Sequence, residues 1–144
     1  MTVVVGFTDR PESAAALQRG AEEARLRTSP LHIIQTVAET VSESPQRAKQ
    51  WAGRLDEIRR RGEAMESDLR AEGLDAHFQV LADAANPSAA TALLEAAREL
   101  DAELIVIGIR RRSPVGKLVL GSISQDVILG ADCAVLAVKA SEDD

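Results

Sequence analysis

Five short apolar runs alternate along the chain with longer segments in which apolar residues recur every three or four positions. The runs cover residues 2–7, 31–37, 74–81, 104–109 and 134–138. Spacings of three and four predict amphipathic helices, whereas short runs rich in Val, Ile and Leu predict strands buried on both faces. Strands separated by helices pair in parallel through right-handed crossovers. We therefore predict a Rossmann-like α/β fold: a single doubly wound, five-stranded parallel sheet with helices on both faces.

Local signals mark the ends of two predicted helices. Gly73 follows the longest helical pattern and predicts a C-terminal cap. Asn86-Pro87 predicts the start of the next helix, because proline fits the first helical turn. Arg59, Arg60 and Arg61 lie on and beside the polar face of the longest helix, and we interpret them as a solvated surface.

Size and charge limit the class of protein. The 144 residues suit one domain, which we assign to residues 1–140, with 141–144 as a short acidic tail. A net charge of −6, with one Trp, two Phe and no Tyr, argues against binding to nucleic acid or anionic membrane. Cys133 is the only cysteine, so no internal disulfide forms, and we interpret it as a buried structural thiol. No signal peptide or membrane-spanning run is recognised, and we expect a cytoplasmic protein.

The connection after the fourth strand is the strongest candidate for a binding site. At residues 110–118 it exceeds the roughly 2–6 residues usual for strand-to-helix loops. It carries or adjoins four basic residues and three glycines: Arg110, Arg111, Arg112, Lys117, Gly108, Gly116 and Gly121. In open parallel sheets, ligands bind beyond the carboxyl ends of the strands, and a helix starting near Gly121-Ser122 offers free N–H groups to an anion. The pattern predicts a phosphate-sized anion site; the alternative is a basic surface loop.

Other chemistry finds little support. His32 and His77 sit in separate strand regions, without a Cys or acidic cluster at metal-ligand spacing, so we predict no metal site. No Ser/His/Asp grouping or nucleophile motif is present, and we predict no catalytic residues. A phospho-receiver domain shares the alternating layout, and Lys139 suits it, but such a domain needs an acidic pair where only Asp9 stands.

Three C-terminal segments together resemble the universal stress protein family: residues 105–108, 121–124 and 133–139. Nucleotide-binding members of that family share glycine, two residues, glycine, nine residues, glycine, and then Ser or Thr. Gly108 matches the first glycine, and Gly121-Ser122 matches the closing pair thirteen positions later. The likeness also includes residues 3–17, 31–37 and Asn86-Pro87, so it spans nearly the whole chain.

The resemblance implies the strand order 3-2-1-4-5 and a stress-response module that binds an adenine nucleotide, ATP or AMP. It places Thr8 and Thr36 beside the base, with Gly108 nearby. At the phosphates it places Arg111, Gly121, Ser122 and Ile123. Two positions depart from the family: Thr8 stands where an acidic residue commonly ends the first strand, and Arg111 replaces the middle glycine. Arg111 would either contact the phosphates or fill their pocket.

Two other functions stay open within the family. One is a dimeric scaffold or interaction protein that binds no nucleotide, and the other is a slow ATPase. Under the implied strand order, residues 134–138 form an edge strand that is apolar on both faces and carries no charge before Lys139. Since unprotected edges tend to pair, we predict a homodimer through this strand. The opposite edge, residues 76–80, alternates apolar and polar residues, as a partly exposed strand should.

Overall fold

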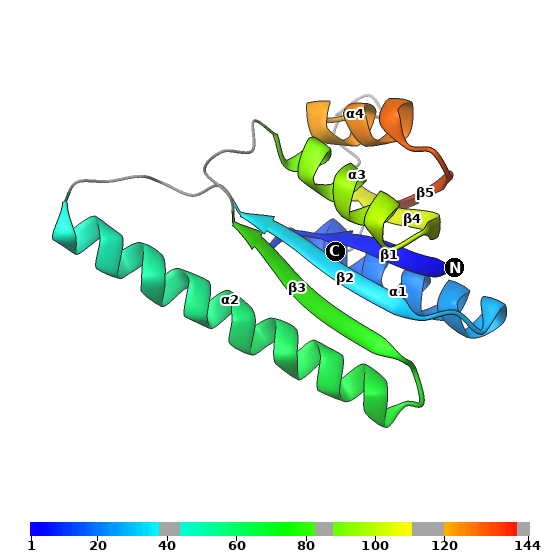
Figure 1. Ribbon diagram of the computed structural model, residues 1–144, viewed down its shortest axis with the longest axis horizontal. Helices are drawn as coiled ribbons and strands as arrows, with labels where there is room; N and C mark the ends of the chain where they lie inside the picture. The colour runs from blue at the N-terminus through cyan, green and yellow to red at the C-terminus, as the bar shows by residue number, and fades with distance from the viewer. Residues whose placement is uncertain (38–43, 83–87, 111–119, 141–144) are drawn as a thin grey trace.

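The computed structural model describes residues 1–37, 44–82, 88–110 and 120–140. Within these residues, five parallel strands form one sheet in the order β3-β2-β1-β4-β5 (Figure 1). They are β1 (Thr2–Phe7), β2 (Leu31–Val37), β3 (Ala76–Ala82), β4 (Ala102–Ile109) and β5 (Ala134–Lys139). The predicted α/β class and strand order are both confirmed.

The four helices that connect the strands are α1 (Pro11–Arg27), α2 (Pro45–Ala71), α3 (Ala89–Glu99) and α4 (Ser122–Gly130). Helices α1 and α2 cover one face of the sheet, and α3 and α4 cover the other (Figure 1). Alternate residues of β1 therefore enter different cores: Val3 and Val5 pack with α1, whereas Val4 packs with α3. This explains why Val3-Val4-Val5 and residues 104–107 are apolar at successive positions.

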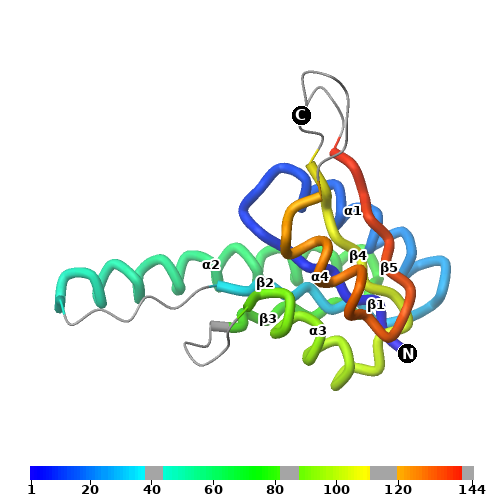
Figure 2. Tube along the Cα trace, turned by 90° about the horizontal axis from the view of Figure 1, so that it is seen from above, coloured from blue at the N-terminus to red at the C-terminus, as the bar shows by residue number. Residues whose placement is uncertain are grey.

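Helix α2 lies along β3 and extends beyond the sheet at its N-terminal end (Figures 1 and 2). Its buried residues are Ile58 and Gly62, and a side chain at Gly62 would collide with the ring of Phe78. The helix ends as predicted, because Gly73 adopts a φ of +90° and the N–H of Leu74 donates to the carbonyl of Leu69. Residues 59–61 are exposed, which confirms the interpretation as a solvated surface.

Several local predictions are refined by the structure. The third strand begins at Ala76, and Leu74 is instead a buried residue of the preceding turn. Helix α3 is capped by Ser88, whose Oγ accepts a hydrogen bond from the N–H of Thr91. Asn86-Pro87 and the acidic tail 141–144 lie outside the described residues.

Cys133 is half-buried beside the core formed by α3 and α4. Burial raises the pKa of its thiol, and the neighbouring carboxylate of Asp132 raises it further. A thiol kept protonated is a poor nucleophile, which agrees with a structural role. None of the described helices combines the length and the apolar character required to cross a membrane.

Candidate functional site

A pocket of about 330 Å³ opens at the carboxyl ends of β1, β2 and β4 and is closed on one side by α4. Six of the seven predicted site residues line it: Thr8, Thr36, Gly108, Gly121, Ser122 and Ile123. The seventh, Arg111, lies outside the described residues, so its two alternative roles stay predictions. The pocket lies at the reversal of strand order between β1 and β4, where open parallel sheets bind ligands.

The floor of the pocket is apolar. It is formed by side chains of the sheet and of the two helices above it: Ile34, Leu93, Ile107 and Val127. Hydroxyl, charged and backbone polar groups surround this floor. A pocket of this kind suits a ligand with one flat, weakly polar part and one strongly polar part.

Thr8 is exposed, but its polar groups are held by the first turn of α1. The N–H of Thr8 donates to Ser13 Oγ at 2.9 Å, and the two hydroxyl oxygens are also 2.9 Å apart. Ser13 is only 2% exposed, so this contact fixes the loop between β1 and α1 against the helix. Sequence reasoning identified Thr8 as a site residue but not Ser13, which is the third residue of α1.

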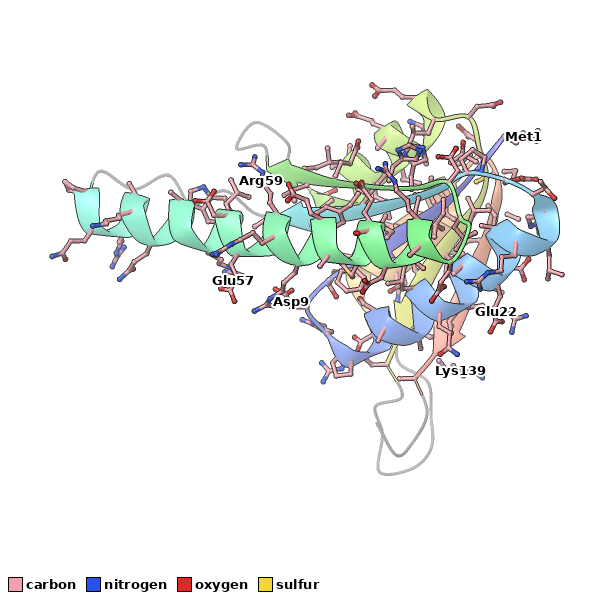
Figure 3. The ribbon with its side chains drawn as sticks, turned by 90° about the horizontal axis from the view of Figure 1, so that it is seen from below. Met1, Asp9, Glu22, Glu57, Arg59 and Lys139 are labelled. Carbon is pink, nitrogen blue, oxygen red and sulfur yellow. The ribbon has the colours of Figure 1, made fainter. Side chains whose placement is uncertain are left out.

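The carboxylate of Asp9 does not line the pocket. Gln35 Nε2 donates to Asp9 Oδ1 at 3.3 Å, and Arg61 Nη1 of α2 lies 3.9 Å from the same oxygen. Figure 3 shows Asp9 beside α2, near Glu57. Asp9 therefore contacts Gln35 and α2 from the β1–α1 loop. It does not take the place of the acidic residue that family members commonly carry at the position of Thr8.

The two site glycines serve different purposes. A Cβ at Gly108 would collide with the backbone oxygen of Glu12, so this glycine lets the first turn of α1 pack on the end of β4. Among the described residues, a Cβ at Gly121 would meet nothing within 4 Å, and the φ of Gly121 is −68°. This φ lies outside the left-handed region, so the backbone at this position does not itself require glycine. What Gly121 contributes is open space in the pocket.

Helix α4 presents its N-terminus to the pocket. Gly121 is the N-cap residue and has no side chain to accept from the first turn, so the early N–H groups are available to a ligand. Aligned peptide dipoles add a partial positive charge there. The cationic residue Arg10 also lines the pocket. Together these groups can hold an anion.

Sequence reasoning missed a second charged group in the pocket wall, Glu12. Its side chain is 9% exposed, and Glu12 Oε1 lies 3.8 Å from Arg110 Nε. Nothing in the local sequence marks this residue, because a glutamate in the first turn of a helix is ordinary. Only the close packing of α1 on Gly108 brings it into the pocket.

Comparison with known proteins places these features in a family. The model of the universal stress protein family matches residues 1–139. A universal stress protein of Mycolicibacterium smegmatis is 36% identical over 137 residues, which cover 95% of this chain and 96% of that protein. A universal stress protein structure from Archaeoglobus fulgidus has a TM-score of 0.73 at 33% identity, covering 96% of this chain and 98% of its own. Another from the same organism, in complex with dAMP, has a TM-score of 0.68 at 28% identity, with the same coverage. The chain belongs to the universal stress protein family.

Proposed function

We propose that this protein is a stress-response binding module that holds an adenine nucleotide, ATP or AMP, in the pocket above the sheet. The observation that carries the proposal is the convergence of six predicted residues on one pocket with an apolar floor and a helix N-terminus. Its volume, about 330 Å³, falls within the range of small-ligand sites, roughly 300–1,000 Å³. The dAMP complex of the relative from Archaeoglobus fulgidus supports an adenine nucleotide as the class of ligand.

In the proposed pose, the base lies over the apolar floor between Thr8 and Thr36, and the phosphates lie against the first turn of α4. Backbone N–H groups of α4 and the guanidinium of Arg10 stabilise the phosphate charge. The proposed role is binding and presentation of the nucleotide, not turnover. Slow ATP hydrolysis would appear as phosphate release in the same samples.

We also propose that two copies pair through β5. This assembly suits the nucleotide-binding module and equally the alternative function, a dimeric scaffold without nucleotide. Nucleotide binding separates the two functions, so it is the first measurement to make.

The test replaces Ile123, which is 53% exposed in the first turn of α4, with glutamate. Ile123→Glu suits the helix dipole and leaves the core intact, but it places a negative charge where the phosphates would bind. Wild-type protein at about 100 times the dissociation constant of AMP should gain roughly 2.7 kcal/mol, a melting shift of several degrees. The variant should bind AMP at least about tenfold more weakly, because like charges repel in a partly buried site.

Leu26→Glu is the matched control, since Leu26 is 80% exposed on α1 and does not line the pocket. It should bind AMP as the wild type does. Calorimetric titration measures the affinity, and thermal melting without ligand shows that each variant is folded. Absence of any melting shift with ATP, ADP or AMP in the wild type would reject nucleotide binding and leave the scaffold.

A further inference from the structure

Glu12 is a buried charge that the proposed function does not yet use. It is the second residue of α1, lines the pocket and has a side chain that is 9% exposed. Burying a carboxylate costs several kcal/mol unless partners replace the water that it loses. The partners of Glu12 therefore decide what the pocket can bind.

Those partners are few. The nearest cation is Arg110, whose Nε lies 3.8 Å from Glu12 Oε1, which is too far for a hydrogen bond. Arg110 is itself 40% exposed, so water screens part of its charge. Within the described part of the chain, no hydrogen bond to the Glu12 carboxylate is present. Both of its oxygens thus retain the capacity to accept hydrogen bonds from a ligand.

The position of Glu12 indicates which part of a nucleotide it would meet. The strand order fixes the order of the residues across the mouth of the pocket. Thr36 at the end of β2 comes first, Thr8 after β1 comes next, and Gly108 on β4 follows, with α4 on the far side of β4. Glu12 packs directly on Gly108: the Cβ of Glu12 lies 3.0 Å from the position that a Cβ would occupy if residue 108 had a side chain. It therefore stands between the end proposed for the base and the end proposed for the phosphates, where a nucleotide has its sugar.

We propose that Glu12 accepts hydrogen bonds from the sugar hydroxyls and makes the pocket selective for ribonucleotides over deoxyribonucleotides. This inference rests on the proposed nucleotide binding. A ribose offers two adjacent O–H donors, which match the two oxygens of one carboxylate. Hydrogen bonds to an ionised group are roughly twice as strong as neutral ones, so one missing hydroxyl is costly. An acidic residue binds the ribose hydroxyl in dinucleotide-binding sheets for the same reason.

The experiment titrates the full chain with AMP, with 2′-deoxy-AMP and with 3′-deoxy-AMP by calorimetry. Wild-type protein should bind AMP about tenfold or more tightly than either deoxy form, since each lacks one donor to the carboxylate. Glu12→Ala should bring the ratio close to one by weakening AMP binding. Glu12→Gln keeps the shape and one acceptor oxygen, so its ratio should lie between the two. Melting curves without ligand show whether each variant folds.

Glu22→Ala is the matched control, because Glu22 lies on the same helix with its side chain 51% exposed and does not line the pocket (Figure 3). It should keep the wild-type ratio. Equal wild-type affinities for AMP and its deoxy forms would overturn the inference while leaving nucleotide binding intact. So would a Glu12→Ala variant that binds all three ligands more tightly, since the carboxylate would then only repel phosphate. Absence of binding by all three would overturn the proposed function and this inference with it.

Discussion

The two edges of the sheet differ in how their backbone groups are satisfied. At the β3 edge, side chains of α2 replace a neighbouring strand: the N–H of Phe78 donates to Glu66 Oε2, and Arg70 Nε donates to the carbonyl of Ala76, both at 2.7 Å. Glu66 and Arg70 lie one turn apart and pair at 3.5 Å. At Ala76 and Phe78, side chains of α2 therefore take backbone hydrogen bonds that an added strand would need.

At the β5 edge no comparable cover is seen. The strand is half-buried at its four central positions and exposed at Ala134 and Lys139. In the described ranges of the chain, no side chain forms a hydrogen bond with the backbone of β5. Open backbone groups on an apolar strand favour pairing with another chain.

This difference between the edges gives a reason to expect that assembly stops at two copies. A sheet with two open edges could add strands at both and grow into a filament. Because side chains of α2 bond to the β3 edge, we expect pairing at β5 alone, and a strand that pairs with its own copy about a two-fold axis leaves no further edge. On this account, Glu66 and Arg70 serve assembly as well as stability.

The largest effect is expected from a charge on the open edge. Ala134→Lys places a lysine at an exposed position of each β5 strand of the dimer, so two like charges approach across the interface. The dissociation constant should rise by about 100-fold or more, because like charges at an interface cost several kcal/mol. Sedimentation at micromolar concentration should show a dimer for the wild type and the 15.4 kDa monomer for the variant.

Gln79→Lys provides the control at the covered edge. Gln79 is an exposed residue of β3, and lysine there should leave the dimer unchanged. A wild type that sediments only as a monomer would contradict the proposed pairing. Equal loss of dimer in the two variants would contradict the difference between the edges.

A smaller effect is expected from uncovering β3. Glu66→Ala removes the acceptor of the Phe78 N–H and the ion-pair partner of Arg70. The Glu66 side chain is 23% exposed, so the free energy of unfolding should fall by about 1.5–3 kcal/mol, the usual contribution of a hydrogen bond to a charged group. Urea denaturation measures the change, and sedimentation should now show species larger than the dimer.

Two further variants sharpen this result. Glu66→Gln keeps an acceptor oxygen and should restore much of the lost stability. Glu63→Ala removes an exposed carboxylate from the same helix and should change stability by less than about 0.5 kcal/mol. If Glu63→Ala and Glu66→Ala destabilise the protein equally, the hydrogen bond between Glu66 and the Phe78 N–H does not contribute to the free energy of unfolding as proposed.

The sequence predicts most of the fold because its signals are local. Each apolar run predicts the strand that it forms. Gly73 predicts the end of α2, and in the structure this glycine has a positive φ. The glycine spacing around Gly108 and Gly121 likewise identifies one wall of the pocket. These signals need no knowledge of what lies nearby in space.

Long-range contacts could not be predicted in this way. Glu66 and Phe78 are twelve positions apart, and nothing in either segment links them. Glu12 enters the pocket only because α1 packs on Gly108. His32 and His77 lie in separate strands, as predicted, and the parallel register of β2 and β3 aligns them, so that their rings stack with centroids 4.6 Å apart.

The smallest expected effect is a pH dependence confined to the β3 side of the sheet. Burial lowers the pKa of His32, and the stacked ring of His77 lowers it further, while the carboxylate of Asp75 acts in the opposite direction. Asp75 also contacts His77 Nε2 at 2.8 Å, and Arg70 Nη2 lies 3.4 Å from His77 Nδ1. The folded protein thus binds a proton at His32 less readily than the unfolded chain does.

Because the unfolded state takes up that proton first, stability should be complete above the ordinary histidine value of 6.5 and should decline as the pH falls below it. His32→Gln should reduce the slope of unfolding free energy against pH between about pH 7.5 and 5.5, measured by urea denaturation. The dimer should not follow this trend, since neither of the two histidines lies on β5. An unchanged slope in His32→Gln would show that His32 does not contribute to the pH dependence of stability.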